Sequence, residues 1–314
     1  MTGLITAGES LALIYTRATG GLDVLSEAAV SYGGAESNVA IAAARLEADA
    51  SWIGRIGDDA FGRRIVRSIR GEGITVHGVV DDSVPTAMMV KDRPSLGRTR
   101  VLYYRSGNAG SRLQADDLPR PELENAKIFH FTGISLALSE EMAQTVLTAA
   151  KIVRDAGGMV SFDLNYRSTM WSAEAAGPAF REAIAISDIV FAGDDEAAIA
   201  VGKGSVDELT QRIAALGPDE IIIKLGDRGA YARQGDEVIE QAPFLVEVAD
   251  TVGAGDAFVG GYLAEHLAGL DLTSRMRTAA AAGACACRGD GDWEMMPTRR
   301  DIAELMAGGD PVSR

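Results

Sequence analysis

A glycine-rich loop that contains one carboxylate, Asp250-Thr251-Val252-Gly253-Ala254-Gly255-Asp256, leads into an apolar helical stretch. Gly253 and Gly255 allow a tight turn in which successive N–H groups point at one spot, and the helix adds its positive end. This pattern predicts a phosphate site. A carboxylate costs free energy beside a polyanion, but Asp256 is well placed to take a proton from an attacking hydroxyl. The alternative is structural, with Asp256 as a helix cap.

Two arginines indicate the charge of a second ligand. Tyr103 and Arg105 are two apart on a predicted strand, so both side chains project from one face, and Arg167 follows the strand that ends at Asp163. Because guanidinium binds carboxylate in a bidentate manner and neutral sugars rarely need it, two convergent arginines predict a small acid as substrate. The alternative is that each arginine forms a separate surface ion pair.

Alternating strand-like and helical segments must position these residues. The predicted parallel strands are Leu4–Ala7, Ser51–Ile53, Ile128–Phe131, Met159–Leu164, Ile189–Phe191 and Ile221–Leu225. The clearest helical segments are Ser37–Leu46, Asp59–Glu72 and Ser139–Ala156. This order predicts an α/β fold with an open, mostly parallel sheet covered on both sides. Ligands bind beyond the carboxyl ends of such strands, where Gly8-Glu9, Asp163–Arg167, Gly193–Glu196 and Gly226–Gly229 follow.

Two stretches interrupt the alternation, within residues 11–34 and 74–107. The second contains predicted strands Thr86–Val90 and Thr99–Arg105, separated by a predicted turn over Arg93–Gly97. We expect a small antiparallel flap on one α/β domain that spans residues 1–314. A two-stranded ribbon with apolar residues such as Leu102 on one face is marginally stable alone, so we predict a homodimer through the flap, or a higher oligomer.

Charge and composition exclude several classes of protein. The 314 residues have a formal net charge of −15 and a pI near 4.7, which disfavours binding to nucleic acid or an anionic membrane. The first ten residues lack the features of a signal peptide, and no stretch is apolar enough for a membrane helix, so we expect a cytoplasmic protein. Cys285 and Cys287 are interpreted as buried small hydrophobes, and the three histidines are too scattered to suggest ligands.

Four motifs, taken in order, resemble the ribokinase-like (PfkB) family of ATP-dependent sugar kinases. They are Gly33–Ala40, Gly54–Gly62, Lys224–Gly229 and the loop with Asp256, and the resemblance extends from about Ile5 to about Leu305. It implies a three-layer α/β/α core with a lid. A nicotinamide-dependent oxidoreductase is disfavoured, because the first strand is followed by Gly8-Glu9-Ser10 and not by a GxGxxG dinucleotide fingerprint. Within the family, the segments 33–38, 103–106, 163–167 and 291–294 look most like 2-keto-3-deoxygluconate kinases.

The resemblance implies roles for individual residues. Asp256 would be the general base, and the amides of Gly253, Ala254 and Gly255 would hold the transferring phosphoryl group. The implied substrate-binding residues are Gly34, Asn38, Tyr103, Arg105, Arg167, Asp256 and Asp292. The implied nucleotide-binding residues are Asn165, Arg167, Lys224, Gly226, Gly229, Gly253 and Gly255. ATP and Mg²⁺ are the implied cofactors, with Glu196 organising Mg²⁺ through water, and K⁺ near Asp250–Thr251 is a further cation that the family allows.

The sequence departs from the family pattern at two positions. Gly193 stands where an Asn-x-x-Glu element usually begins, and Met89 stands where the ketodeoxygluconate kinases usually offer an aromatic hydroxyl. A kinase for a related sugar acid, the C4 epimer, or a neutral sugar such as fructose or ribose therefore stays open. So does a non-catalytic binding protein on the same fold. We also expect positive potential to be confined to a cleft around Arg105, Arg167, Lys224 and the helix end at Gly255.

Overall fold

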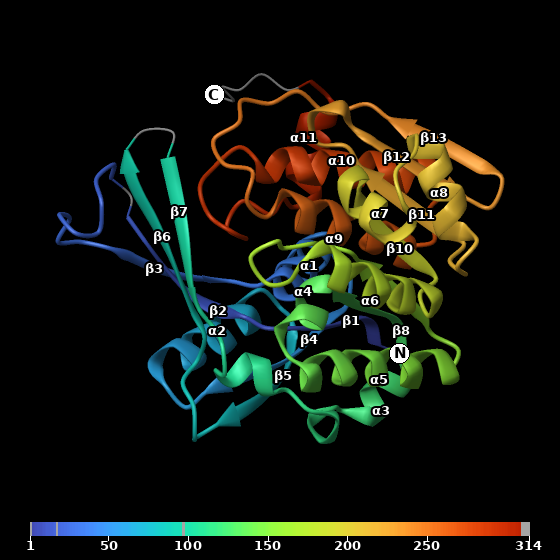
Figure 1. Cartoon of the computed structure of the whole chain (residues 1–314). Helices are drawn as coiled ribbons and strands as arrows, with labels where there is room; N and C mark the ends of the chain where they lie inside the picture. Colours follow the sequence, from blue (N-terminus) through green and yellow to red (C-terminus); the bar gives the residue numbers. More distant parts are fainter. Residues whose placement is uncertain (1, 17, 96–97, 309–314) are drawn as a thin grey trace.

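A large, mostly parallel sheet forms the centre of the protein in a computed structural model that describes residues 2–16, 18–95 and 98–308 (Figure 1). Its strands run in the order β13-β12-β11-β10-β9-β8-β1-β4-β5; β12 pairs antiparallel with both β11 and β13, and the other strand pairs among the described residues of this sheet are parallel. Their bounds are β1 Thr2–Ala7, β4 Ala50–Gly57, β5 Thr75–Asp81, β8 Ala126–Thr132, β9 Met159–Asp163, β10 Ile189–Gly193, β11 Glu220–Lys224, β12 Ala230–Gln234 and β13 Glu237–Gln241. All six predicted parallel strands are confirmed, with shifted ends.

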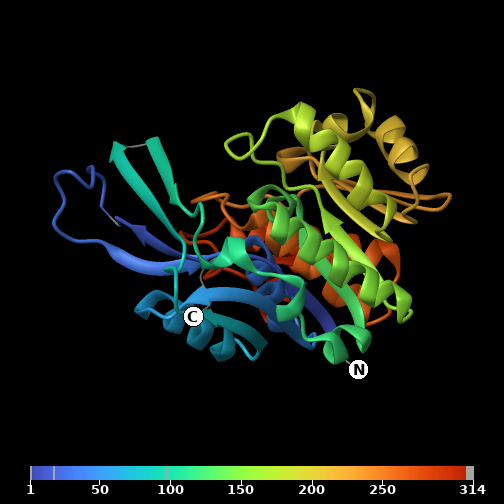
Figure 2. The ribbon, with the colours of Figure 1, turned by 60° about the horizontal axis from the view of Figure 1, so that its bottom comes forward.

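Helices cover both faces of this sheet (Figures 1 and 2). One layer contains α1 Ala35–Arg45, α2 Ala60–Gly71, α9 Ala254–Leu267, α10 Leu272–Ala286 and α11 Arg299–Met306. The other contains α3 Arg120–Glu124, α4 Gly133–Leu138, α5 Glu140–Asp155, α6 Ala173–Ala185, α7 Asp194–Val201 and α8 Val206–Ala214. Successive strand residues alternate between the two cores, so Ile128 packs with the first layer and Phe129 with the second. The predicted α/β fold is confirmed.

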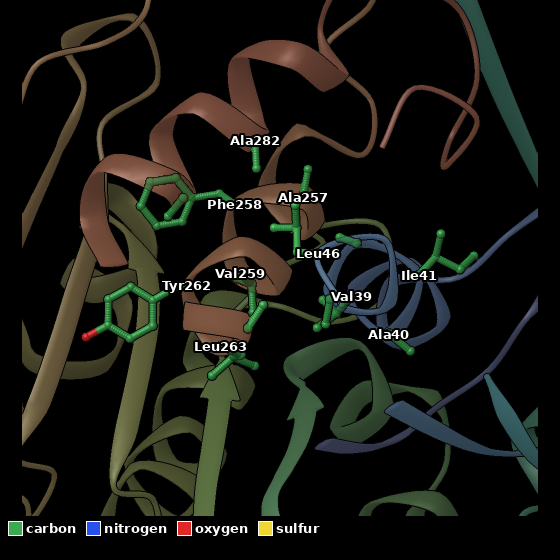
Figure 3. Close-up of a cluster of buried hydrophobic side chains, with 14 of the residues drawn as sticks. Val39, Ala40, Ile41, Leu46, Ala257, Phe258, Val259, Tyr262, Leu263 and Ala282 are labelled. Carbon is green, nitrogen blue, oxygen red and sulfur yellow. The ribbon is translucent and has the colours of Figure 1, made fainter. Parts of the chain in front are cut away.

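The packing of α9 against α1 places the glycine-rich loop. Val259 and Leu263 of α9 meet Val39 of α1 in the buried cluster of Figure 3. A Cβ on Gly260 would lie 2.5 Å from Ala42 Cβ, so the two helices approach as closely as they do because this residue is glycine. The contact brings the first turn of α9 beside Asn38 on α1.

A second sheet forms a lid beside the core (Figure 1). Its order is β3-β2-β6-β7, with β3 Ala29–Gly33, β2 Leu11–Tyr15, β6 Met88–Ser95 and β7 Arg98–Tyr104. The predicted flap is thus confirmed and enlarged, and its central pair, β2 and β6, is parallel. The predicted turn is wrong over Arg93–Ser95, because β6 continues to Ser95, which pairs with Arg98. The rest of that turn, Leu96 and Gly97, lies outside the described residues.

Three further elements are short 3-10 helices, η1 Ala109–Arg112, η2 Ala115–Asp117 and η3 Gly226–Arg228. Among the described residues, we find no helix with the length and apolar character that a membrane crossing requires.

The two cysteines differ in burial. Cys285 is buried as predicted, whereas Cys287 is partly exposed at the end of α10, where its carbonyl accepts a hydrogen bond from the amide of Ala249.

Candidate active site

A cavity of about 580 Å³ opens at the carboxyl ends of the central strands, beneath the lid. It brings together most of the predicted site residues, namely Gly34, Asn38, Tyr103, Arg105, Asn165, Arg167, Glu196, Lys224, Gly253, Gly255, Asp256 and Asp292. Three predicted residues do not line it. Ala254 is the first residue of α9, and Gly226 and Gly229 lie in the turn after β11.

The glycine-rich loop ends in an uncapped helix. Gly253 is the N-cap of α9 with a left-handed φ of 77°, and a Cβ there would lie 2.0 Å from the carbonyl oxygen of Asp292. No side chain of the N-cap satisfies the amides of the first turn, and these amides have no acceptor inside the helix. The amide of Ala254 donates to the carbonyl of Thr251 at 3.3 Å, so Gly253 and Gly255 are the residues that present N–H groups, with the positive helix end, to the cavity. This arrangement binds phosphate.

Asp256 lies in the first turn of α9, beyond the N-cap position that the structural alternative requires. Its Oδ2 accepts a hydrogen bond of 2.8 Å from Asn38 Nδ2. Burial raises the pKa of Asp256 to about 7; the Asn38 hydrogen bond, Arg167 and Lys224 oppose this rise and Asp163 adds to it. A carboxylate with this pKa is matched to proton transfer near neutral pH.

Lys224, at the end of β11, is a cation beside the N-terminus of α9. Its Nζ lies 2.6 Å from Asp163 Oδ2 and 3.8 Å from the position of a Cβ on Gly255. Burial acts to lower the pKa of Lys224, but Asp163 and Glu196 raise it above the ordinary value, so the amine stays charged. The second oxygen of Asp163, Oδ1, is buried and has no hydrogen-bond partner.

Glu196 joins two segments of backbone at the edge of the cavity. Its Oε1 accepts from the amide of Tyr166 at 2.8 Å, and its Oε2 accepts from the amide of Gly193 at 2.7 Å. Burial raises the pKa of Glu196. In the part of the chain that the structure describes, no three His, Cys, Asp or Glu residues form a metal cluster.

Arg105 is held by a buried acid that the sequence did not single out as its partner. Its Nη2 lies 2.6 Å from Glu9 Oε2, and the guanidinium stands over the ring of Tyr103 at 5.3 Å. Glu9 is 3% exposed, and burial raises its pKa to about 7 although Arg105 opposes this rise. The predicted ion-pair alternative is thus half right, because Arg105 does pair with an acid, but inside the cavity.

The charge of the cavity differs from the expectation. Among the described residues that line it, six are acids and four are bases, so the excess of acids extends into the cleft that we expected to be positive. Of these four bases, Lys91, Arg105 and Lys224 each contact an acid, whereas no acid among the described residues forms an ion pair with Arg167. The reason is that buried bases need compensating charge, which the sequence pattern does not show.

Three functional candidates were missed as individual residues: Glu9, Lys91 and Asp163. Lys91 was detectable in principle, because it is two residues from Met89 on β6 and both side chains face the cavity. Met89 itself is 7% exposed and lies on the cavity wall, so no hydroxyl is offered there.

Comparisons with known proteins agree with this geometry. The model of the pfkB family carbohydrate kinases matches residues 8–299. The chain is 33% identical to the 2-dehydro-3-deoxygluconokinase of Bacillus subtilis (strain 168), covering 96% of this chain and 95% of the relative. It is 34% identical to the enzyme of the same name from Thermoproteus tenax, with 98% and 94% covered. Fructokinase-1 of Zea mays is 32% identical, with 87% and 88% covered.

Solved structures show the same relationship. The PfkB protein from Polaromonas sp. JS666 superimposes with a TM-score of 0.88 at 30% identity, covering 98% of this chain and all of that chain. The fructokinase of Vibrio cholerae O395, solved with fructose, ADP and calcium ion bound, has a TM-score of 0.85 at 25% identity, with 97% and 99% covered. The chain therefore belongs to the pfkB family of carbohydrate kinases, which are phosphotransferases with an alcohol group as acceptor.

Proposed function

We propose that the protein phosphorylates the terminal hydroxyl of 2-keto-3-deoxygluconate, or of a close relative such as its C4 epimer, with ATP as donor. The observation that carries this proposal is the presence of Arg105 and Arg167 in the same cavity as Asp256. A base placed on an anion-binding loop needs a hydroxyl beside it, and two guanidinium groups favour a carboxylate at the other end of the substrate. The names of the two deoxygluconokinase relatives support the same substrate class.

A kinase for a neutral sugar is the second candidate. The Glu9 carboxylate already neutralises much of Arg105, and a fructokinase is among the relatives of similar identity. In that case Arg167 would serve the nucleotide phosphates alone. The two candidates therefore differ in what the two arginines bind.

The residues present fit ATP with Mg²⁺. The uncapped amides at Gly253 and Gly255 and the amine of Lys224 provide donors for phosphate oxygens, and Asn165 and Arg167 lie on the same wall. The unpartnered Oδ1 of Asp163 and the carboxylate of Glu196 would face a hydrated Mg²⁺ through water. When bound, Mg²⁺ neutralises charge on the transferring phosphoryl group. Gly226 and Gly229 would contact the nucleotide outside the cavity.

The chain's own groups would divide the remaining work. Asn38 orients the Asp256 carboxylate, which accepts the proton of the sugar hydroxyl as its oxygen forms a bond to phosphorus. The amides of the loop stabilise the negative charge on the phosphoryl oxygens while the bond to the leaving diphosphate breaks. The lid residues Tyr103 and Arg105, with Gly34 and Asp292, would hold the sugar and exclude water.

The proposal is tested by measuring ADP release with a panel of sugar acids and neutral sugars, including both C4 epimers of the ketodeoxy acid. We expect kcat/KM to be highest for a ketodeoxy sugar acid. Highest kcat/KM for fructose or ribose would favour the second candidate. Binding of sugar and ATP without ADP release from any member of the panel would favour a binding protein.

The pH dependence of the reaction follows from Asp256. A base with a pKa of about 7 is protonated below that pH, so we expect kcat/KM to fall about tenfold per pH unit on the acid side and to level off above about pH 8. Because burial also raises the pKa of Asp292 to about 7, the acid limb includes the titration of Asp292. A value of kcat/KM that does not change between about pH 5.5 and about pH 7 would contradict the role of Asp256 as the base.

The outer face of the lid predicts a homodimer. A row of apolar residues crosses all four strands in register on the side opposite the cavity: Leu102, Val90, Ile14 and Val30. Leu102 is 49% exposed, and Tyr104 on the same face is 54% exposed. We propose that a second copy covers this row, since burial of these side chains would stabilise the lid.

Sedimentation would test the dimer. We expect two copies at about micromolar concentration, and we expect Leu102→Glu to give a monomer because the substitution places a charge in the interface. Val238→Glu on the edge strand β13 is the matched control, because Val238 is 39% exposed and lies on the far edge of the other sheet. A monomeric wild type would contradict the proposal.

A further inference from the structure

Lys91 is a buried lysine on the inner face of the lid that the proposed reaction does not use. It lies on β6, only 7% of its surface is exposed, and its amine forms an ion pair with Asp250. A buried ammonium needs a charged partner, because its loss of hydration is otherwise uncompensated. This pair therefore connects the lid to the segment that leads into the glycine-rich loop.

Asp250 begins that loop and touches its backbone. Its Oδ1 accepts from the amide of Val252 at 3.2 Å, and the neighbouring amide of Ala249 donates to the carbonyl of Cys287 at 2.8 Å. Gly253, the N-cap of α9, is the next residue after Val252. One carboxylate thus contacts both the lid lysine and the turn that orients the phosphate-binding amides.

Asp292 makes a second connection between the same two parts. Its carbonyl oxygen lies against Gly253, and its carboxylate lies against Gly33 of lid strand β3, where a Cβ would be 1.8 Å from Oδ2. Glu294, two residues later, accepts a hydrogen bond from Ser31 on the same strand. Burial raises the pKa of Asp292, and the charges of Lys91 and Arg167 oppose this rise. The Lys91 ammonium therefore interacts electrostatically with Asp292 as well as with Asp250.

We propose that Lys91 is a positioning residue that couples the lid to the phosphate-binding loop. The Lys91 ammonium holds Asp250, and Asp250 holds the backbone at Val252, so the loop takes its reactive arrangement with the lid in place over the sugar. This inference rests on the proposed function, because it assigns the loop to phosphoryl transfer. It accounts for the buried charge of Lys91 on this face of the lid, where the neighbouring residues Met89 and Tyr103 carry no charge.

The test compares Lys91→Met and Lys91→Arg with Asp92→Ala. Asp92 is the matched control, because it is the next residue on β6 and its contact, with the amide of Leu22, stays within the lid region. We expect Lys91→Met to lower kcat about 10- to 100-fold, as a misplaced reacting group does, with KM for the sugar changed less than about twofold. Lys91→Arg should recover most of the loss, and Asp92→Ala should resemble the wild type.

Hydrogen exchange gives a second measurement that does not depend on which sugar is the substrate. In Lys91→Met without ligands, we expect the amides of Val252 and Ala254, which donate to Asp250 Oδ1 and to the carbonyl of Thr251, to exchange about tenfold faster than in the wild type. The Asp92→Ala variant should leave them unchanged. Thermal melting checks that each variant folds, and Lys91→Gln replaces Lys91→Met if the latter does not.

Two results would overturn the proposal. An increase in KM for the sugar with unchanged kcat would show that Lys91 binds the substrate directly. Unchanged exchange at Val252 and Ala254 would show that the ion pair does not hold the loop. If the panel of sugars yields no substrate, the proposed function fails while the exchange measurement still decides whether Lys91 couples lid and loop.

Discussion

Replacing Asp256 by Asn is expected to lower kcat by about 10²- to 10⁴-fold, the usual contribution of a general base. The substitution removes the group whose pKa of about 7 suits proton transfer. The side chain keeps its shape, and its amide oxygen can still accept the hydrogen bond from Asn38 Nδ2. The measurement is ADP release under saturating sugar and ATP, together with calorimetric binding of both ligands, which we expect to stay within a few-fold of the wild type.

Asp195→Asn is a matched control for this experiment. Asp195 also lines the cavity, but it belongs to α7, where its Oδ1 accepts the amide of Glu196. Its substitution removes one negative charge from the same cavity without touching the loop. Turnover of Asp256→Asn at the rate of the wild type, or an equal loss in Asp195→Asn, would remove Asp256 from the role of base.

The location of the site was predictable because it follows from strand direction. Parallel strands end at one edge, so residues that follow β9, β10 and β11 had to meet there. Asn165 and Arg167 follow β9, Glu196 follows β10, and Lys224 ends β11; the cavity includes all four. Alternating hydrophobicity and the order of segments were sufficient for this part of the fold.

The partners of the charged residues were not predictable in the same way. Lys91 and Asp250 are 159 positions apart, and their contact depends on where the lid sits relative to α9. Arg105 and Glu9 meet because the end of β7 folds over the end of β1. The strand pattern predicts which face a lid residue uses, but it does not indicate which acid lies opposite that face. The net charge of −15 likewise did not show that the cavity itself has more acids than bases.

The pairing of Arg105 changes how the carboxylate-binding hypothesis must be tested. Removal of Arg105 alone would leave Glu9, 3% exposed, as a buried acid without its partner, and a buried polar group without a partner destabilises a protein by itself. A loss of affinity in Arg105→Met would then mix substrate recognition with damage to the fold. The double variant Glu9→Gln/Arg105→Met avoids this, because both charges of the pair are removed together.

We expect this double variant to bind the ketodeoxy sugar acid less tightly by about 2–5 kcal/mol, the typical cost of removing one partner of a desolvated charge pair. This corresponds to about a 30- to 5,000-fold increase in Kd, measured by calorimetry. Binding of the substrate's uncharged amide analogue should change far less, since it makes no ion pair with Arg105. Glu9→Gln alone is the control; it frees Arg105 and should bind the acid at least as tightly as the wild type.

The comparison with the amide analogue decides between the two candidate substrates. If Arg105 recognises a carboxylate, the acid and its amide must differ in the size of their loss, because only the acid carries the charge that the guanidinium attracts. Equal losses for both ligands would mean that Arg105 positions the lid without binding a charge. In that case a neutral sugar would become the better candidate. Arg167, which has no acidic partner among the described residues, would then bind the nucleotide phosphates.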